Sequence, residues 1–432
     1  MSGAPLTRAQ VLTQFAYDDR PVPAAADSAM GDRPLAGVRI LAVEQMQAVP
    51  FATQLLAHLG AEVVKVEHPT QGESGRAAQP SIRDDDGRAV GATYLRNNLG
   101  KKSIGLDLKH PRGVDLLRRL VPHYDVVAEN FKPGTMERLG VGYDVLAADH
   151  PGLVYVSVSG FGGLLPTPYG AWPAYAVVAE AMGGFYSFRP EPGRLPNIGV
   201  AGALGDIGSA LFAAIGTLAA LEGRRRTGRG QRVDVAMFDA MLPLMDMVLF
   251  NPSIGIRDNS LAAWPGICTS FAASDGLFVV QVGREHQFER FAAAVGHPEW
   301  LADPRFATRE GWSKHEGDVI RPAVERWARE RTKLEASRAL AERGIVAGPS
   351  NDADDLRRDP HVRAHGMVIE VPRPDGGPPL HVAGNPIKLS GSAEPQAQRW
   401  PRLGEHTDEI LARDLALGAA ERAALREAGV IG

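Results

Sequence analysis

The stretch GVRILAVEQMQAVPFATQLLAHLGAEVVKVE, residues 37–67, decides the fold class of this chain. Two short runs rich in Val and Ile, 37–44 and 61–67, enclose a segment with helical spacing at 50–60. A strand, a helix and a second strand in this order form the unit from which parallel sheets are built. The alternation continues in segments at 102–108, 114–123, 125–130, 153–160, 206–222 and 231–250. The pattern predicts an α/β domain with a parallel sheet, in which 231–250 is a strand followed by one long apolar helix.

The pattern changes near residue 250 and predicts a second domain. Residues 1–34 show no sustained periodicity and are interpreted as an N-terminal extension, which places the large domain at 35–250. Turn-forming residues at 251–266 indicate a linker. We expect a smaller α+β domain at 267–360, and a return segment with C-terminal helices at 361–432 that packs on the large domain.

The return segment carries two more specific predictions. Residues 361–391 have the pattern of a hairpin around the turn at Asp375, Gly376 and Gly377. Residues 407–428 have the pattern of two terminal helices.

Composition excludes several classes of protein. The 432 residues include 47 basic and 51 acidic side chains, so the net charge of −4 provides no global positive field for nucleic acid or an anionic membrane. The single cysteine, Cys268, cannot form an internal disulfide, and the N-terminus shows no apolar signal segment. The helix-like run 207–221 is shorter than a membrane span. We expect a cytoplasmic protein without nucleic-acid or membrane partners.

Common catalytic and cofactor motifs are missing from the sequence. The turn after the first strand reads EQMQAVP, residues 44–50, and lacks the glycines that let a backbone approach a pyrophosphate. The chain has no phosphate loop, no H-E-x-x-H helix and no G-x-S-x-G elbow. Its 12 histidines are scattered, so we assign none of them to a metal. We expect no permanently bound cofactor and no metal.

Asp206 is the carboxylate with the most unusual setting. The segment Gly202-Ala203-Leu204-Gly205-Asp206 leads directly into a long apolar helix. One interpretation is that Asp206 caps this helix and stabilises it by about 1 kcal/mol. The other is that the helix N-terminus holds the carboxylate ionised, so that it acts as a nucleophile and forms a covalent intermediate. The sequence is compatible with both.

Basic residues near the predicted strand ends favour a phosphorylated ligand. The loop Asn130–Arg138 follows a strand, at the end where open α/β sheets bind ligands, and it contains Lys132 and Arg138. Lys101 and Lys102 lie at the start of the segment 102–108 and add positive charge. The run of arginines at 224–226 follows a helix and is interpreted as a helix end and turn.

The ordered segments of the chain resemble the class III CoA-transferases. This family includes formyl-CoA:oxalate and carnitine/crotonobetaine CoA-transferases and, more distantly, α-methylacyl-CoA racemase. The resemblance runs from about Leu35 to Ala428 and is carried by NNLGKKSIGLDLK, VAENFKPGTMERLGVGYDVL, GALGDIGSALFAAIGTLAAL, RRTGRGQRVDVAMFDAML, GIVAGPSND and LGEHTDEIL.

The resemblance implies a fold and a reaction. The fold is a Rossmann-like large domain with a smaller domain, and two ring-like chains interlock as a homodimer. The reaction moves CoA from an acyl-CoA donor to a carboxylic acid acceptor. The Gly205-Asp206 pair occupies the place of the family nucleophile, so Asp206 is expected to form an aspartyl anhydride and then an aspartyl-CoA thioester. Acyl-CoA is thus a substrate, and no cofactor stays bound.

Several other residues of this sequence match individual site positions of the family. Gln47 and Ala48 match the Gln-Ala pair near the acyl thioester, and we take Gln47 as catalytic. Arg138 matches an arginine that contacts CoA phosphates. The remaining matches line the CoA site: His68, Leu106, Lys109, Asn130 and Phe131. His68 stands where an arginine is usual, and a neutral imidazole is a weaker phosphate partner than a guanidinium.

Two features depart from the family pattern. Ala176 stands where many relatives have an acidic residue, and Glu180, one helical turn further, replaces it only if it faces the site. Because a racemase needs an acid or base at the α-carbon, Ala176 counts against racemisation. Residues 251–275 lack the glycine-rich loop of the formyl-CoA enzyme, so we do not expect oxalate or formate as substrates.

Two alternative functions and one substrate hypothesis stay open at this point. The chain is alternatively an α-methylacyl-CoA racemase or epimerase, or a non-catalytic acyl-CoA-binding subunit of a heteromeric transferase. Five aromatic residues near the expected acyl end either pack in the core or favour a bulky or aromatic acyl group: Tyr169, Trp172, Tyr175, Phe185 and Tyr186.

Overall fold

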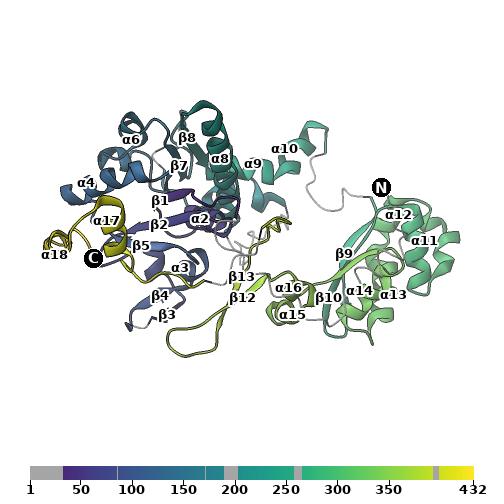
Figure 1. The fold of residues 1–432 in the computed structure, drawn as a ribbon. Helices are drawn as coiled ribbons and strands as arrows, with labels where there is room; N and C mark the ends of the chain where they lie inside the picture. The colour runs from purple at the N-terminus through teal and green to yellow at the C-terminus, as the bar shows by residue number, and fades with distance from the viewer. Residues whose placement is uncertain (1–32, 85, 171, 189–202, 257–264, 393–397) are drawn as a thin grey trace, which may run out of the picture. The chain divides into compact units, whose positions relative to one another are not determined.

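A computed structural model describes residues 33–84, 86–170, 172–188, 203–256, 265–392 and 398–432. It divides the chain into two compact units (Figure 1). The larger unit contains the described residues of Met1–Tyr186, Pro196–Asp246 and Pro360–Gly432. The smaller unit contains those of Ser187–Leu195 and Met247–Asp359. Most of the predicted N-terminal extension lies outside the described residues.

A six-stranded parallel sheet forms the centre of the larger unit, which confirms the predicted α/β architecture. Its order is β5-β2-β1-β6-β7-β8, and every neighbouring pair is parallel. Counted along the chain, this is the strand order of dinucleotide-binding sheets. The strands are β1 (Arg39–Val43), β2 (Glu62–Glu67), β5 (Lys102–Gly105), β6 (Val126–Glu129), β7 (Val154–Ser159) and β8 (Arg232–Ala236).

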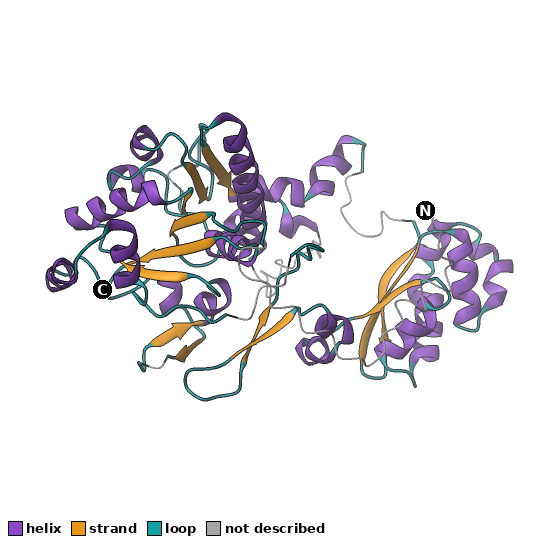
Figure 2. Ribbon diagram, viewed as in Figure 1, coloured by secondary structure: helices purple, strands orange, loops and turns teal. Residues whose placement is uncertain are grey.

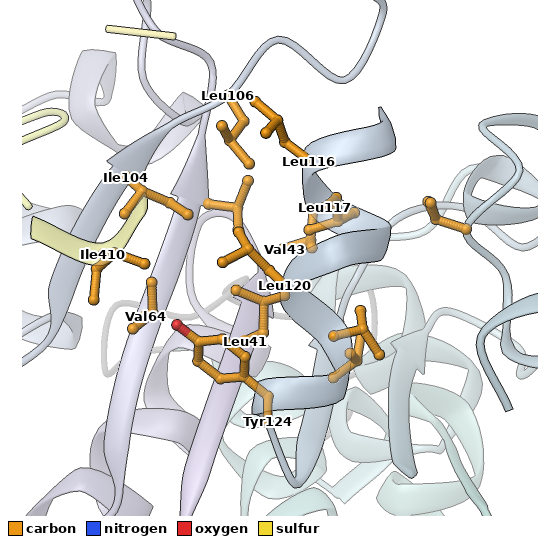
Figure 3. Close-up of a cluster of buried hydrophobic side chains, with 14 of the residues drawn as sticks. Leu41, Val43, Val64, Ile104, Leu106, Leu116, Leu117, Leu120, Tyr124 and Ile410 are labelled. Carbon is orange, nitrogen blue, oxygen red and sulfur yellow. The ribbon is translucent and has the colours of Figure 1, made fainter. Parts of the chain in front are cut away.

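Helices cover the sheet and seal its main hydrophobic core. Leu41 and Val64 of the sheet pack with Leu117 of α4 (Pro111–Leu120) and Ile410 of α17 (Thr407–Leu415) (Figure 3). These side chains are almost completely buried, and each contributes about 1.5–3 kcal/mol. Besides α8 and α9, described below, the described part of this unit has α2 (Ala48–His58), α3 (Ala92–Asn97), α5 (Thr135–Arg138), α6 (Tyr143–Asp149), α7 (Ala176–Met182), α16 (Pro360–Ala364) and α18 (Ala419–Glu427).

Helix α8 (Leu204–Thr227) is longer than the sequence indicates. It ends at Thr227, and Gly228 with a φ of +71° provides the left-handed turn that follows many helices. The arginines at 224–226 therefore lie in the last turn of the helix, rather than after it as expected from the sequence. Its 24 residues give it the length and composition of a membrane span, which corrects the expectation that it is too short. Half of its most apolar window is buried inside the protein, and it packs on α2, β7 and β8. We therefore interpret it as a core helix.

The predicted long helix after β8 is wrong. The chain instead forms α9 (Met237–Leu244) and α10 (Asp246–Ser253), with a non-helical residue, Met245, between them. Pro243 explains the break, because proline lacks an N–H and its ring clashes with the carbonyl four residues before it. The predicted linker begins with the end of α10, and residues 257–264 lie outside the described part of the chain.

Two predicted C-terminal features are confirmed. Strands β12 (Val368–Val371) and β13 (Leu380–Ala383) form an antiparallel hairpin, and Gly376 has a φ of +72° in its turn. Helices α17 and α18 are the predicted terminal pair. A second short hairpin, β3 (Ser81–Arg83) with β4 (Ala89–Gly91), was not expected from the sequence.

The smaller unit is an α+β arrangement with an antiparallel sheet (Figure 2). Its strands are β9 (Ile267–Ala273), β10 (Gly276–Val282) and β11 (Val346–Pro349), in the order β11-β10-β9. An aromatic cluster fills its core, where the rings of Phe288 and Trp312 stack at 4.3 Å. Its helices are α11 (Glu285–Ala294), α12 (Arg309–Lys314), α13 (Arg321–Ala328), α14 (Lys333–Ala341) and α15 (Ala353–Arg358), with a π-helical turn at Glu316–Ile320.

Candidate active site

The carboxyl edge of the parallel sheet gathers most of the predicted site residues. Strands β1, β2 and β5 extend the sheet in one direction, and β6, β7 and β8 extend it in the other. The direction therefore reverses between β1 and β6, and open α/β sheets bind ligands in the crevice at such a reversal. Gln45 follows β1 and Asn130 follows β6, so both lie at this point.

Asn130 ties the two sides of the reversal together. Its Oδ1 accepts a hydrogen bond from the Gln45 N–H at 2.9 Å, and its Nδ2 donates to the Gln45 carbonyl at 2.8 Å. A side-chain amide can bracket one peptide in this way because it holds a donor and an acceptor side by side. Asn130 thereby fixes the start of the loop that leads to Gln47.

The loop between β1 and α2 is strained, and side chains from other parts of the chain hold it by hydrogen bonds. Met46 has a φ of +60°, which is unfavourable for a residue with a side chain. Its N–H donates to Oε2 of Glu73 at 2.9 Å. The next residue, Gln47, precedes the first residue of α2, and its side chain accepts a hydrogen bond from Arg96 at 2.9 Å rather than capping the helix. Ala48, the first residue of α2, is buried.

Asp206 lies in the first turn of α8, but it is not the capping residue. The helix starts at Leu204 and its cap position is Ala203, whose side chain has no oxygen with which to accept a bond. The capping interpretation of Asp206 is therefore wrong. Helix α8 precedes β8, so its first turn lies at the carboxyl edge of the sheet, as does the first turn of α2, on which α8 packs.

The environment makes the Asp206 carboxylate unusually basic. Burial, followed by the negative charge of Glu180, raises its pKa from 3.8 to about 6, while the guanidinium of Arg96 opposes this shift. The pKa of Asp206 is therefore raised overall, although this carboxylate lies in the first turn of α8. At neutral pH the carboxylate is still largely ionised, and a more basic carboxylate is a better nucleophile.

Arg96 connects the two residues that the sequence marks as catalytic. Its Nη2 donates a hydrogen bond to Oε1 of Gln47, and its positive charge interacts electrostatically with the Asp206 carboxylate. Sequence reasoning missed Arg96. Its only signal was its place directly before the NNLGKK segment that carries the resemblance.

Helix α7 packs directly on the start of α8. A Cβ on Gly205 would lie 2.9 Å from the Ala176 carbonyl oxygen and 3.0 Å from its Cα, so this close approach requires glycine. Glu180, one turn further along α7, is buried and accepts a hydrogen bond from the Gly205 N–H at 3.0 Å. Glu180 therefore faces the site.

A buried network of charges lies behind the Met46 loop. Lys101 Nζ is 2.6 Å from Glu44 and also donates to the Pro50 carbonyl. Lys65 Nζ is 3.5 Å from Glu44 and 3.6 Å from Glu73. Burial lowers the pKa of Lys101 to about 8, although Glu44 opposes the shift. The sequence led us to expect that Lys101 provides a surface charge for a phosphate. The structure contradicts this expectation, because Lys101 is buried. The neighbouring Lys102 is partly exposed but forms ion pairs with Glu62 and Glu409.

Three of the predicted CoA-lining residues follow strands β2 and β5. His68 comes directly after β2, and its Nδ1 accepts a hydrogen bond from the Thr70 N–H at 3.3 Å. Leu106 follows β5, but its side chain is only 1% exposed and belongs to the main core (Figure 3). Only its backbone can therefore face a ligand. Lys109 is exposed.

The other predicted CoA-lining residues follow β6. The Phe131 N–H donates to Glu129 at 2.8 Å, and its ring packs against the main core. Arg138 is exposed at the end of α5 and donates to the hydroxyl of Thr135 at 2.9 Å. Phe131 and Arg138 therefore lie on the same side of the reversal as Asn130.

The five aromatic residues noted in the sequence separate into different groups. Tyr169 and Trp172 form a ring cluster with Phe161 and Phe238. A cavity of about 320 Å³ lies beside it, lined by side chains that include Phe161, Tyr169 and Phe238. Phe185 and Tyr186 form a separate pair, and Tyr175 is 77% exposed.

These features define the class of protein. A parallel sheet provides a ligand-binding edge, and a basic carboxylate at a helix start near a guanidinium that binds an amide is suited to nucleophilic attack on an activated acyl group. Within the described residues, no three His, Cys, Asp or Glu side chains converge as a metal site.

Comparison with known proteins identifies the family. Residues 35–407 match CoA-transferase family III, and the chain belongs to that family. It is 36% identical to the succinyl-CoA–D-citramalate CoA-transferase of Chloroflexus aurantiacus over 92% of this chain and 98% of that protein. It is 34% identical to a formyl-CoA:oxalate CoA-transferase of Rhodopseudomonas palustris over 92% and 97% of the two chains.

A solved structure gives the same result. The chain aligns with a CAIB/BAIF family protein from Brucella suis with a TM-score of 0.78 and 32% identity, over 88% of this chain and 99% of that one. The protein is therefore an enzyme of the class III CoA-transferase type, which uses acyl-CoA and carboxylic acids as substrates. The names of these relatives favour CoA transfer over racemisation.

Proposed function

We propose that the enzyme transfers CoA through covalent intermediates on Asp206. An Asp206 oxygen attacks the thioester carbon of the donor, the C–S bond breaks, and a mixed anhydride and CoA thiolate result. The thiolate attacks the Asp206 carbonyl of the anhydride, which releases the donor acid and leaves an aspartyl-CoA thioester. The acceptor carboxylate attacks the carbonyl carbon of this thioester, its C–S bond breaks, and a second mixed anhydride and CoA thiolate result. The thiolate then attacks the acceptor carbonyl of that anhydride, which forms the acceptor's CoA thioester and frees the Asp206 carboxylate.

The neighbours of Asp206 are suited to these steps. Each attack places negative charge on a carbonyl oxygen, and preorganised donors lower the barrier for such steps. Arg96 is a donor whose charge acts on Asp206, and it holds the side chain of Gln47 by a 2.9 Å hydrogen bond. We propose that Gln47 faces the reacting thioester and that His68, Lys109, Asn130, Phe131 and Arg138 border the CoA moiety, with the backbone of Leu106 beside them.

The observation that carries this proposal is the place of Asp206, a buried carboxylate in the first turn of α8 at the carboxyl edge of the sheet, where it interacts with the charge of Arg96. The experiment is incubation of the protein with acetyl-, succinyl- and benzoyl-CoA in the presence of hydroxylamine, followed by peptide mass spectrometry. We expect a hydroxamate on Asp206. Asp144→Asn is the matched control, because Asp144 is an exposed carboxylate in the first turn of another helix, α6.

The outcomes separate the alternatives. The Asp206→Ala variant is expected to lose the adduct, whereas Asp144→Asn keeps it. An adduct on another residue would refute the role of Asp206. If CoA binds without any adduct or transfer, the non-catalytic subunit is correct. Solvent-deuterium exchange at the α-carbon without transfer would identify a racemase.

The aromatic cavity supports a bulky or aromatic acyl group as substrate. The cavity borders the segment from Phe161 to Tyr169, which leads into α7, and Ala176 of α7 touches Gly205. Aromatic rings favour contact with other rings and large apolar groups. Equal activity on the smallest acids would contradict this preference.

A homodimer is supported by an apolar stripe on α8. Leu211, Ile215 and Leu218 follow helical spacing and are 44%, 61% and 36% exposed. Exposed apolar stripes of this kind mark interaction surfaces. We propose that a second copy of the chain covers the stripe in the interlocked arrangement that the family resemblance implies.

Oligomeric state tests this proposal directly. Light scattering is expected to give twice 46.2 kDa for the native protein. Ile215→Glu is expected to weaken the dimer, while Leu301→Glu, on an exposed apolar residue of the smaller unit, leaves it intact. A native mass of one chain would refute the homodimer.

A further inference from the structure

Glu180 is a buried carboxylate with an unusual set of partners. Only 6% of the residue is exposed. Its Oε1 accepts a hydrogen bond from the Gly205 N–H at 3.0 Å, and its Oε2 accepts one from the Tyr186 hydroxyl at 2.5 Å. Both donors are neutral, and no lysine or arginine in the described part of the chain forms an ion pair with it. Because burying a carboxylate without a cation is costly, this arrangement suggests a role beyond stability.

The partner amide of Glu180 belongs to the start of α8. The first N–H groups of a helix have no partner within the helix and are usually bound by the side chain of the capping residue. Ala203 holds the capping position and has no such side chain. Glu180 replaces it from helix α7, because it accepts from Gly205, the second residue of α8. The residue that follows Gly205 is Asp206.

The charge of Glu180 also reaches the nucleophile. The charged groups that face Asp206 are Arg96 from α3, which favours the ionised carboxylate, and Glu180 from α7, which opposes it. Gln47, from the start of α2, is neutral. On its far side Glu180 meets the neutral hydroxyl of Tyr186. Glu180 is therefore the one like charge next to Asp206 among the described residues.

We propose that Glu180 is a positioning residue that acts through Asp206: it fixes the first turn of α8 by binding Gly205, and it places a negative charge next to the nucleophile. The proposal rests on the proposed function, in which Asp206 attacks the thioester. It also assigns to Glu180 what Ala176 cannot provide, a carboxylate at this point of α7.

The two parts of the role are separable by substitution. Glu180→Gln removes the charge but keeps an oxygen that can accept from Gly205. Glu180→Asp keeps the charge but shortens the side chain, so the bond to Gly205 is lost or lengthened. Glu222→Gln is the matched control, because it removes an exposed carboxylate from α8, the helix of Asp206, about 24 Å from Asp206 at about 1.5 Å per residue.

The experiment measures the rate of hydroxamate formation on Asp206 between pH 4.5 and pH 8, with acetyl-, succinyl- and benzoyl-CoA as probes. In the native protein the rate is expected to rise with pH around the pKa of Asp206, about 6. In Glu180→Gln this rise is expected to move to lower pH by about one unit. In Glu180→Asp it stays in place while the plateau rate falls about tenfold, and Glu222→Gln matches the native protein.

The outcomes distinguish a failure of the proposal for Glu180 from a failure of the proposed function of Asp206. A Glu180→Gln profile with the native midpoint would overturn the electrostatic role, whatever its plateau. If that variant does not fold, a Glu180→Asp protein with the native plateau rate would overturn the positioning role. A native protein that forms no adduct on Asp206 at any pH would refute the proposed function itself, and this result differs from both failures of Glu180.

Discussion

The side-chain amide of Asn130 brackets the backbone of Gln45, with bonds of 2.9 and 2.8 Å to its N–H and its carbonyl. The two residues are 85 positions apart and follow the strands between which the sheet order reverses. Because the Gln45 backbone leads directly to Met46 and Gln47, this bracket sets the geometry of the strained loop.

Asn130→Ala is expected to lower both stability and acyl-CoA affinity. Two hydrogen bonds are lost, at about 0.5–1.5 kcal/mol each, and the loop before Gln47 is released. Urea unfolding and the KM for acyl-CoA measure the two effects. Asn385→Ala is the control, because Asn385 brackets Ile387 in the same way, with bonds of 2.8 and 3.1 Å. It is expected to lose similar stability with an unchanged KM. Equal KM values for the two variants would contradict the prediction.

Gly205→Ala is expected to reduce activity strongly. The added Cβ meets the backbone of Ala176 at 2.9 and 3.0 Å, so α7 and the first turn of α8 must move apart. Overpacking of this kind costs about 1–3 kcal/mol, and a displacement of about 1 Å at a reacting group costs about 100-fold in rate. The rate of adduct formation and the Tm report the two effects.

Gly223→Ala on the same helix is the matched control for that substitution. The nearest atom to its new Cβ is Gln231 Nε2 at 3.8 Å, so nothing clashes. Replacing a glycine inside a helix by alanine stabilises by about 0.5–1 kcal/mol, and the rate is expected to stay at the native value. A fast Gly205→Ala enzyme would show that the contact between α7 and α8 does not place Asp206.

Lys101→Met is expected to be the most destabilising of these substitutions. Burial alone would raise the pKa of Glu44, but the charges of Lys101 and Lys65 outweigh it and lower that pKa. Removing Lys101 leaves Glu44 with the more distant Lys65, and breaking a buried pair costs about 3–5 kcal/mol. The free energy of unfolding in urea measures the loss. The adjacent Lys102→Met removes partly exposed pairs and is expected to cost less than about 1 kcal/mol.

Glu129 is expected to make stability depend on pH. Burial raises its pKa from 4.5 to about 7, so between these values the folded state binds more protons than the unfolded state. The contribution of Glu129 to stability is therefore present below pH 4.5 and is lost as the pH rises to about 7. Glu129→Gln, which resembles the protonated form, is expected to gain about 1–3 kcal/mol over the native protein across this window. Urea unfolding at several pH values measures this, and the exposed Glu421→Gln is expected to show no such change.

The larger elements of the fold follow from local sequence patterns. Alternating apolar runs are local, so the strands and helices around 37–67 could be placed without knowledge of their partners. Asp206 and the Asn130 loop were also found, since motif spacing and strand ends are visible in the sequence. The break at Met245 was missed because the apolar pattern continues through Pro243.

The contacts that make the site were not predictable in this way. Arg96 lies 49 positions from Gln47 along the chain, in a short helix. Its local sequence indicates only an ordinary surface arginine, so the hydrogen bond to Gln47 was not predictable. Lys101 is 57 positions from Glu44, and nothing near it indicates burial. The requirement for glycine at position 205 comes from the approach of α7, and it is invisible until the two helices are in place.

The aromatic cavity leads to a prediction about substrate choice. Phe161, Tyr169 and Phe238 line a volume of about 320 Å³, and we expect the native enzyme to have a higher kcat/KM for benzoyl-CoA than for acetyl-CoA. Phe238→Ala removes one aromatic ring from the cavity lining. Losses of apolar contact change the discrimination between two substrates by about 10–200-fold. We therefore expect the ratio of kcat/KM for benzoyl-CoA to that for acetyl-CoA to fall by at least about tenfold. Phe250→Ala changes an exposed aromatic residue outside the cavity lining and is expected to leave the ratio unchanged. If Phe238→Ala lowers both kcat/KM values equally, the cavity contributes to packing rather than to acyl recognition, because only a contact with the acyl group distinguishes the two substrates.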